Sequence, residues 1–189
     1  MCGRYQFSED SSPTLAQIIR ELGCTEFAGE IFPSAAAPVL KAEGGAVRPA
    51  LLDWGFPIQG KRLVINARAE TAAVKPLFRD SLNARRCVIP SSGFYEWDTE
   101  KRKYLFRLPD ADTLYMAGIY DLREGRPRFC VLTTAANDSM KEIHDRMPLI
   151  LTKDQVNDWI FDAAAAQKLL GETPPELVKT AEDAQLQLW

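Results

Sequence analysis

The sequence predicts an α+β fold in a single domain, rich in mostly antiparallel β-structure and flanked by peripheral helices. Three observations lead to this prediction. The chain has 189 residues, 46% of them hydrophobic and 26% charged, which is enough to bury one ordinary core. Its middle consists of short runs rich in β-branched and aromatic residues. Turn signals separate these runs, with no long helical crossovers between them, and this favours antiparallel pairing.

Helices are predicted towards both ends of the chain and between the strands. Apolar residues recur at helical spacing through 12–22, and Gly23 ends that helix. A second helix is expected after Pro76, within 75–85. A short helix is expected over 137–146, starting from a cap-like Asn137 or Asp138. Two more helices are expected over 152–160 and 163–170.

Strands fill the space between these helices. A loop containing Pro33 precedes residues 38–56, which are predicted to form two strands around the Gly44–Gly45 turn and to end in an apolar loop tip at Trp54. Residues 63–71 pass from a strand into a loop. The remaining strands are expected within 86–98, 103–108, 113–122, 128–136 and 147–151.

The whole chain, 1–189, is interpreted as one domain with a core at about 2–160 and a C-terminal helical appendage at about 161–189 that carries no chemistry. No apolar run approaches the ~20 residues that span a bilayer, and the first residues lack the apolar region of a signal peptide. We therefore expect a cytoplasmic protein, in bacterial-type cytosol or nucleoid, that has no membrane partner and is a monomer.

The four cysteines are Cys2, Cys24, Cys87 and Cys130, and no two of them form a Cys-x-x-Cys pair. With a single histidine in the chain, the usual spacing of a structural zinc site is missing, so we expect neither a metal nor another cofactor. Cys87 and Cys130 lie in apolar, strand-like runs and are predicted to be buried, inert thiols.

Cys2 stands at a position with special chemistry. An initiator methionine that precedes a small side chain is normally removed, and removal of Met1 would leave Cys2 with an α-amine and a thiol on adjacent carbons. Together these groups form a bidentate nucleophile. An internal cysteine cannot do the same, because its nitrogen belongs to a peptide bond.

Two polar clusters interrupt strand-like segments. Asn66, Arg68 and Glu70 directly follow an apolar run, and Glu96 lies between Tyr95 and Trp97. Strand alternation sends Glu96 to one face and both aromatic residues to the other. A carboxylate in such surroundings would be desolvated and hold its proton more tightly, as a general acid or base requires, although Glu96 could equally face water.

A third cluster contains His144 and Arg146, and a fourth contains Thr133, Thr134 and Asn137. A lone histidine is more often structural than catalytic, and the fourth cluster is best explained by strand-end hydrogen bonding and helix capping. The net charge of −3 speaks against a protein that coats nucleic acid by bulk charge, but several arginines near these clusters could still form a local groove for phosphates.

Taken together, five segments closely resemble the SRAP family, the SOS-response-associated peptidases or abasic-site processing proteins. They are CGRY, WGF, NARAET, RRCVIPSSGFYEW and IHDRMP, they occur in the family's order, and the resemblance extends through residue 151. It implies an SRAP-type core that recognises abasic sites in single-stranded DNA during the DNA-damage (SOS) response. The short segment between GFYEW and TTAAN implies that the loops over the binding groove differ from those of the family.

The resemblance also implies a role for each matching residue. Cys2 would be the catalytic residue that forms a thiazolidine crosslink with the abasic site, Glu96 the acid/base group, and His144 an assistant at the Schiff-base stage. Asn66 would orient the sugar or the N-terminus. The DNA-binding residues would be the phosphate clamps Arg4, Arg68 and Arg146, together with Trp54, Trp97 and Pro33, which would stack or wedge against bases.

Two other interpretations stay open at this stage. The same residues suit an N-terminal-cysteine thiol peptidase, with Cys2 as nucleophile and His144 as base, whose substrate is a peptide or only the protein's own first bond. A peptidase activity, or a lyase activity, would be additional to the crosslinking reaction. The third interpretation is a non-enzymatic module that binds DNA or RNA and in which Cys2 is incidental.

Overall fold

The computed structural model describes residues 3–24, 28–59 and 62–182. Its helices are the 3-10 helix η1 (Glu9–Ser11) and the α-helices α1 (Pro13–Leu22), α2 (Ala69–Ala72), α3 (Arg79–Ala84), α4 (Gln155–Phe161) and α5 (Ala163–Leu169). Its strands are β1 (Tyr5–Ser8), β2 (Ala28–Ile31), β3 (Ala36–Glu43), β4 (Ala46–Trp54), β5 (Phe56–Ile58), β6 (Arg62–Val64), β7 (Asn66–Arg68), β8 (Arg86–Ser91), β9 (Gly93–Trp97), β10 (Lys103–Arg107), β11 (Leu114–Arg123), β12 (Arg126–Ala135), β13 (Arg146–Pro148), β14 (Ile150–Leu151) and β15 (Val178–Glu182).

Five long strands close into a barrel. Strand β12 pairs with β4, β4 with β3, β3 with β8, β8 with β11, and β11 returns to β12. Only the β12–β4 pair in this ring is parallel. Short strands β7 and β13 extend the pairing of β12, and β14 pairs with β11. Because the ring is closed, each of its strands has a hydrogen-bonded neighbour on both sides. The barrel is therefore a rigid support for the short strands β7, β13 and β14.

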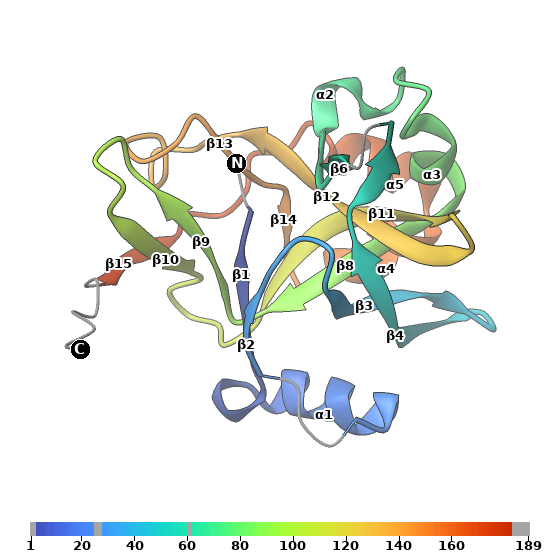
Figure 1. Cartoon of the computed structure of the whole chain (residues 1–189), viewed down its shortest axis with the longest axis horizontal. Coiled ribbons are helices and arrows are strands. Elements are labelled where there is room, and N and C mark those ends of the chain that lie inside the picture. Colours follow the sequence, from blue (N-terminus) through green and yellow to red (C-terminus); the bar gives the residue numbers. More distant parts are fainter. Residues whose placement is uncertain (1–2, 25–27, 60–61, 183–189) are drawn as a thin grey trace.

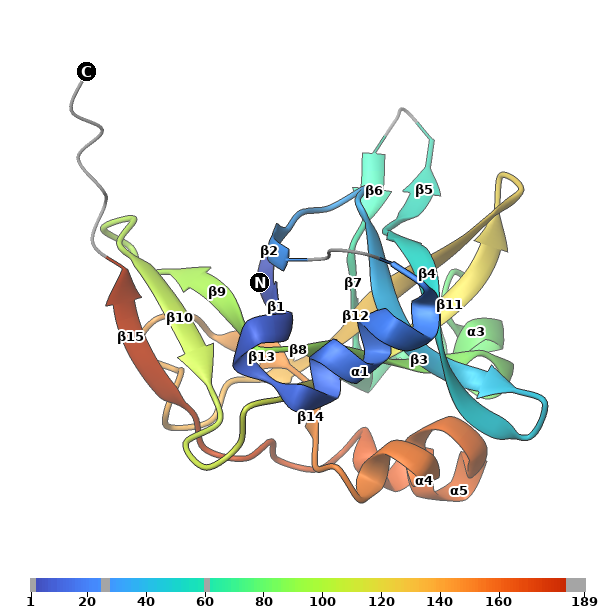
Figure 2. The same ribbon diagram turned by 90° about the horizontal axis from the view of Figure 1, so that it is seen from below.

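A second, five-stranded antiparallel sheet lies beside the barrel in the order β15-β10-β9-β1-β2 (Figure 1). Strand β1 is an inner strand of this sheet: Tyr5 pairs with Phe94 on one side and with Ile31 on the other. Figure 2 shows β1 between β9 and β7, the short strand that pairs with β12. The N-terminal strand is therefore built into the centre of the molecule.

Helix α1 covers one end of this arrangement, as Figure 2 shows. Ser12 caps it by accepting a hydrogen bond from the Leu15 amide at 3.3 Å, and Gly23 ends it in the left-handed conformation. Its apolar stripe packs with β1 and Trp54 in one hydrophobic cluster. A second cluster packs the barrel against α4 and α5. The helix predicted within 12–22 is confirmed.

The α+β, β-rich and mostly antiparallel fold predicted from the sequence is confirmed, with three local corrections. Residues 138–143 form turns where a helix was expected. Residues 178–182, expected within a helical appendage, form β15 and pair with β10. Residues 69–72, expected as loop, form α2. Within the described part of the chain, no helix is long and apolar enough to cross a membrane.

The Asn137 side chain explains the first two corrections together. Its amide nitrogen donates to the carbonyl oxygens of Pro174 and Pro175, both at 3.0 Å, and its oxygen accepts from the Ser139 amide at 3.1 Å. Asn137 thus makes the side-chain bond of a cap residue, but it closes a turn, and residues 138–143 after it form no helix. The Asn137 side chain also binds the C-terminal segment at Pro174 and Pro175, a few residues before β15. Local sequence patterns do not reveal this long-range contact.

Candidate functional site

Glu96 is buried on β9, with 5% of its surface exposed. Its neighbours Tyr95 and Trp97 line a groove of about 910 Å³ on the outer face of the five-stranded sheet, whereas Glu96 does not. Phe94, on the same side of the strand as Glu96, stacks on Phe106 in the core. The predicted division of these residues between the two faces is therefore confirmed, and Glu96 is a desolvated carboxylate.

The start of the chain runs beside Glu96. Tyr5 pairs with Phe94, and the Tyr95 amide donates to the Arg4 carbonyl at 2.9 Å. Continued by one residue, this antiparallel register places Gly3 opposite Glu96. Cys2 and Met1 lie outside the described residues.

Asn66 and Arg68 lie at the two ends of β7, which runs parallel to β12, with Asn66 opposite Val131. Asn66 is half-buried and Arg68 is exposed. Farther along β12, Ala135 pairs with Arg146 of β13. Strand β12 thus brings together, on its two sides, the predicted residues of the NARAET and IHDRMP segments.

His144 lies immediately before β13, and its ring is anchored by the backbone. Its Nδ1 accepts a hydrogen bond from the Arg146 amide at 2.9 Å. The same Nδ1 is 2.8 Å from a carboxylate oxygen of Asp145, but one ring nitrogen cannot accept from an N–H and donate to a carboxylate at once. The Asp145 carboxylate is almost fully exposed to water, so its contact with the ring is the weaker of the two. The bond from the Arg146 amide therefore assigns the ring hydrogen to Nε2.

Arg146 makes a two-pronged ion pair with Glu70. Its Nη1 and Nη2 donate to the two Glu70 carboxylate oxygens at 2.8 and 2.9 Å, and Nη2 also donates to the Thr133 carbonyl at 2.7 Å. The Arg146 side chain is only 13% exposed. Hydrogen bonding to Arg146 lowers the pKa of Glu70, so this carboxylate is ionised at neutral pH. Arg146, predicted as a phosphate clamp, is thus already neutralised by a protein carboxylate.

Arg4 is held on the outer face of the sheet. Its guanidinium is 3.0 Å from a Glu30 oxygen and lies over the rings of Phe32 and Trp97, at 4.3 and 5.1 Å from their centroids. The structure thus brings together two predicted DNA-binding residues, Arg4 and Trp97. The predicted wedge Pro33 is half-buried in the adjoining loop.

The placement predicted for Trp54 is wrong. Trp54 ends β4 in the core with 0% exposure, packs on Tyr5 and Phe129 at ring-centroid distances of 5.2 and 6.1 Å, and donates its indole N–H to the Ile65 carbonyl at 3.0 Å. No face of the indole is available to a base. Trp54 therefore packs against Tyr5 of β1 in the core and has no exposed surface on which DNA could stack.

Three residues beside Arg4 were missed by sequence reasoning: Glu30, Phe32 and Lys103. Phe32 is 46% exposed in the loop before Pro33, and Lys103 is bonded to Glu30 and lies over the Tyr95 ring at 3.8 Å. An aromatic residue beside a proline in a loop was a usable signal for Phe32. The other two come from strands whose pairing is not visible in the sequence.

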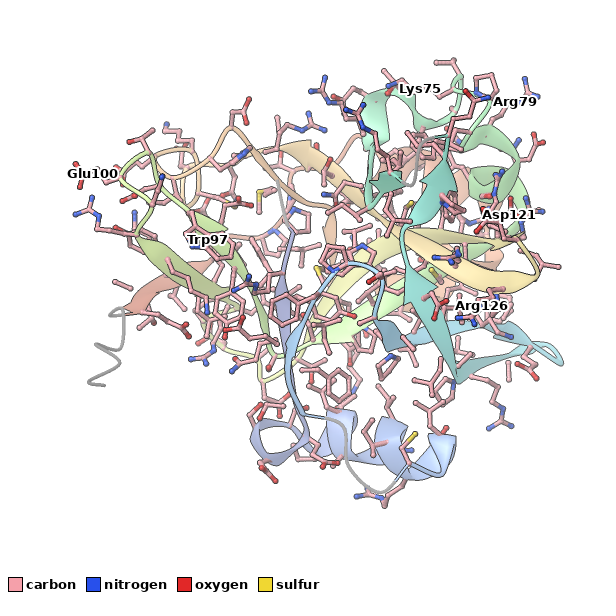
Figure 3. The ribbon with its side chains drawn as sticks, in the orientation of Figure 1. Lys75, Arg79, Trp97, Glu100, Asp121 and Arg126 are labelled. Atoms are coloured by element: carbon pink, nitrogen blue, oxygen red, sulfur yellow. The ribbon has the colours of Figure 1, made fainter. Side chains whose placement is uncertain are left out.

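Lys101, Arg102 and Glu182 also line the groove, whereas other charged groups lie far from it and two cysteines are inert. Figure 3 shows Asp121 and Arg126, on β11 and β12, far from Trp97. Cys87 and Cys130 are fully buried, and burial raises the pKa of both thiols, that of Cys130 to about 12, in agreement with the prediction of inert cysteines. Among the described residues, no group of three or more His, Cys, Asp or Glu side chains could hold a metal ion.

Comparison with known proteins identifies the family of this chain. The model of the family described as SOS response associated peptidase (SRAP) matches residues 1–188. The chain belongs to the SRAP family. Abasic site processing protein YoqW of Bacillus subtilis is 34% identical over 184 residues, covering 85% of this chain and 80% of its own. The protein YobE of the same organism, with the same descriptive name, is 32% identical and covers 85% and 82%.

A solved structure shares the SRAP fold seen here. The crystal structure of a protein from Bordetella bronchiseptica superposes with a TM-score of 0.78 and 23% identity, over 96% of this chain and all of that one. The β-rich barrel with its attached five-stranded sheet is therefore an architecture that this SRAP protein shares with an experimentally determined chain.

Proposed function

We propose that this SRAP protein processes abasic sites in single-stranded DNA by forming a covalent bond through Cys2 after removal of Met1. The α-amine, with a usual pKa of about 7.7–8.0, is substantially neutral at physiological pH and adds to the ring-opened aldehyde of the sugar. Loss of one water gives an imine. The Cys2 thiol then adds across the C=N bond, its sulfur to carbon and its proton to nitrogen, and closes a five-membered thiazolidine ring.

One observation carries this proposal: strand β1 holds the start of the chain beside a buried carboxylate. The Arg4 carbonyl is bonded to the Tyr95 amide, so the register continues towards Glu96. The described part of the chain therefore brings Gly3, which directly follows the proposed nucleophile in sequence, towards this carboxylate. The family membership and the names of the relatives support the choice of abasic DNA as substrate.

Three residues predicted from the sequence are assigned roles in this reaction. Glu96 moves protons during ring opening, imine formation and reversal, because its carboxyl group is buried on the strand that pairs with the start of the chain. His144 offers its Nε2 side at the Schiff-base stage, and Asn66 orients the sugar or the N-terminus. None of these steps needs a metal or another cofactor.

The DNA-binding face is proposed to include Arg4 and Trp97, with Phe32 added to the set predicted from sequence. Arg68 is exposed at the end of β7 and suits a phosphate contact. Pro33 lies next to Phe32 in the chain and would limit the path of the bound DNA strand. We further propose that the protein works as a cytoplasmic monomer, with single-stranded DNA as its partner.

The second candidate, a thiol peptidase, is favoured only by the name of the family. It would use Cys2 as nucleophile and His144 as base, but the His144 Nδ1 is occupied by the Arg146 amide. The crosslinking reaction uses the amine as well as the thiol, and this difference separates the two candidates.

The test is a denaturing gel after incubation with single-stranded DNA that carries one abasic site. Mass spectrometry first confirms the loss of Met1. We expect a protein–DNA band for the wild type and for Cys24→Ser, a matched control at a half-buried cysteine, and none for Cys2→Ala. Cys2→Ala and Cys2→Ser both keep the α-amine once Met1 is removed, so each should give a band only after borohydride reduction of its imine.

Capping the α-amine while the thiol stays free should abolish the band but spare a plain thiol peptidase. A processed wild-type protein that gives no adduct contradicts the proposal. Equal binding of intact and abasic strands by wild type and Cys2→Ala, with no adduct, would instead support the non-enzymatic binding module.

A further inference from the structure

We propose that Glu70 is a positioning residue: it clamps Arg146, and the Arg146 backbone amide in turn holds His144 in one tautomer and one orientation. This inference rests on the proposed function for its effect on crosslinking, but not for its effect on the His144 ring. Glu70 makes no contact with His144, and it acts through the residue that does.

The clamp joins Glu70 and Arg146, which are 76 residues apart along the chain. Glu70 is in the first turn of α2, four residues after Asn66, whereas Arg146 follows His144 by two residues. The two Glu70 oxygens accept from Nη1 and Nη2 of Arg146 at 2.8 and 2.9 Å. The ion pair therefore fixes the distance between the segment that carries Asn66 and the segment that carries His144.

The barrel supplies a third anchor for the same guanidinium. Nη2 of Arg146 also donates to the Thr133 carbonyl on β12, at 2.7 Å. A planar fork held at three oxygens cannot rotate without breaking charge-assisted hydrogen bonds. The Arg146 side chain is 13% exposed and that of Glu70 is 48% exposed, so solvent screens this ion pair from the Glu70 side only.

A single hydrogen bond connects the fixed Arg146 to the ring of His144. The Arg146 amide donates to Nδ1 at 2.9 Å, so the hydrogen of the neutral ring resides on Nε2. Residues 138–143 before His144 are turns, and no regular helix supports the ring from that side. Without the clamp, the start of β13 has more freedom, and the neutral ring can exchange between its two tautomers.

The chain offers a direct readout, since His144 is its only histidine. We expect nitrogen-15 NMR of the wild type at pH 8 to show His144 mainly as the Nε2–H tautomer. Glu70→Gln, which keeps the shape of the side chain but loses its charge, should move the shifts of both ring nitrogens towards the tautomer mixture of free imidazole. Glu70→Asp, which keeps the charge, should lie between the two.

The second readout is the rate of adduct formation at saturating abasic DNA. Glu70→Gln should slow it about tenfold, because a misplaced assisting group costs rate even when binding survives. Affinity for intact single-stranded DNA should stay within about twofold. Glu43→Gln is the matched control: Glu43 is also an exposed, ion-paired glutamate, bonded to Lys41 on the β3–β4 hairpin, and its variant should behave as wild type.

Each outcome decides one question. A wild-type tautomer and a wild-type rate in Glu70→Gln overturn the inference. Tighter binding of intact DNA with an unchanged rate also overturns it, since Glu70 would then only mask the charge of Arg146. If the wild type forms no adduct at all, the proposed function fails, and the NMR shifts alone still decide whether Glu70 positions His144. Thermal melting of Glu70→Gln and Glu70→Asp separates local from global unfolding.

Discussion

Arg4 and Glu30 form an ion pair of 3.0 Å at the mouth of the outer groove, and Glu30 is shared with Lys103. One carboxylate thus faces two cations. Lys103 is in turn 2.8 Å from Glu182 of β15, so the network crosses the whole five-stranded sheet. This arrangement fixes Arg4 beside Trp97 and at the same time reduces the positive potential that a phosphate would meet.

Removal of the Glu30 charge should therefore strengthen DNA binding. We expect Glu30→Gln to bind intact single-stranded DNA about two- to fivefold tighter at 50 mM salt, with a steeper dependence on salt concentration, because Arg4 and Lys103 lose a competing anion. Fluorescence anisotropy across a salt series measures both quantities, with Glu43→Gln as the control. Weaker binding by Glu30→Gln would mean that Glu30 orients Arg4 more than it masks its charge.

Trp54 and Trp97 should respond to substitution in opposite ways. Trp54→Phe removes the indole bond to the Ile65 carbonyl and leaves a gap in the core, at a cost of about 1–3 kcal/mol in the free energy of unfolding. Its affinity for DNA should be unchanged. Trp97→Ala should leave stability nearly unchanged and weaken DNA binding by about 1–3 kcal/mol. Urea unfolding and anisotropy on both variants check this, and lost DNA affinity in a stably folded Trp54→Phe would contradict it.

The contrast between these two tryptophans shows which features could be predicted from the sequence. Trp97 lies in a short strand whose alternation is local, so its face was predicted correctly. Trp54 precedes Gly55, a combination that resembles a loop tip in the sequence. Its burial depends on the parallel pairing of Trp54 with Phe129 of β12, 75 residues away, and that pairing leaves no periodic signal.

The same distinction holds for the fold as a whole. The hairpin around Gly44 and Gly45 was predicted from the Gly-Gly turn signal, and in the structure both glycines adopt left-handed conformations, at φ of 59° and 79°, that favour this residue type. Barrel closure, β15 and the Asn137 clamp depend on contacts between distant segments. The candidate site follows this rule: its residue types were visible in the sequence, whereas the partners Glu30 and Glu70 depend on tertiary packing.

Arg86 should be essential for stability and irrelevant to DNA. It is buried at the start of β8 and donates hydrogen bonds to the carbonyls of Leu82, Asn83, Trp159 and Ile160, which ties α3 and α4 to the barrel. Arg86→Met leaves these carbonyls without their donor and should cost about 3–5 kcal/mol. The exposed Arg79→Met is the matched control and should cost less than about 0.5 kcal/mol. Equal midpoints of urea unfolding for both variants would contradict this role.

Alkaline pH should destabilise the protein through Tyr95. The ring is 2% exposed, and burial, with a smaller contribution from Glu182, raises the pKa of Tyr95 to about 12. In the unfolded chain the phenol titrates near 10. The folded state thus holds this proton more tightly, so its contribution to stability is complete below pH 10 and is lost as the pH rises from about 10 to 12.

The slope of this loss approaches about 1.4 kcal/mol per pH unit for each such group. Urea unfolding at intervals between pH 8 and 11.5 gives the slope of the unfolding free energy against pH. Tyr95→Phe should reduce this slope by up to the contribution of one titrating group. The difference in phenolate absorbance between wild type and Tyr95→Phe reports the titration of Tyr95 itself. A midpoint near pH 10 in the folded protein would mean that water reaches the phenol from the groove, and that the Lys103 ammonium over the ring stabilises phenolate more than burial opposes it.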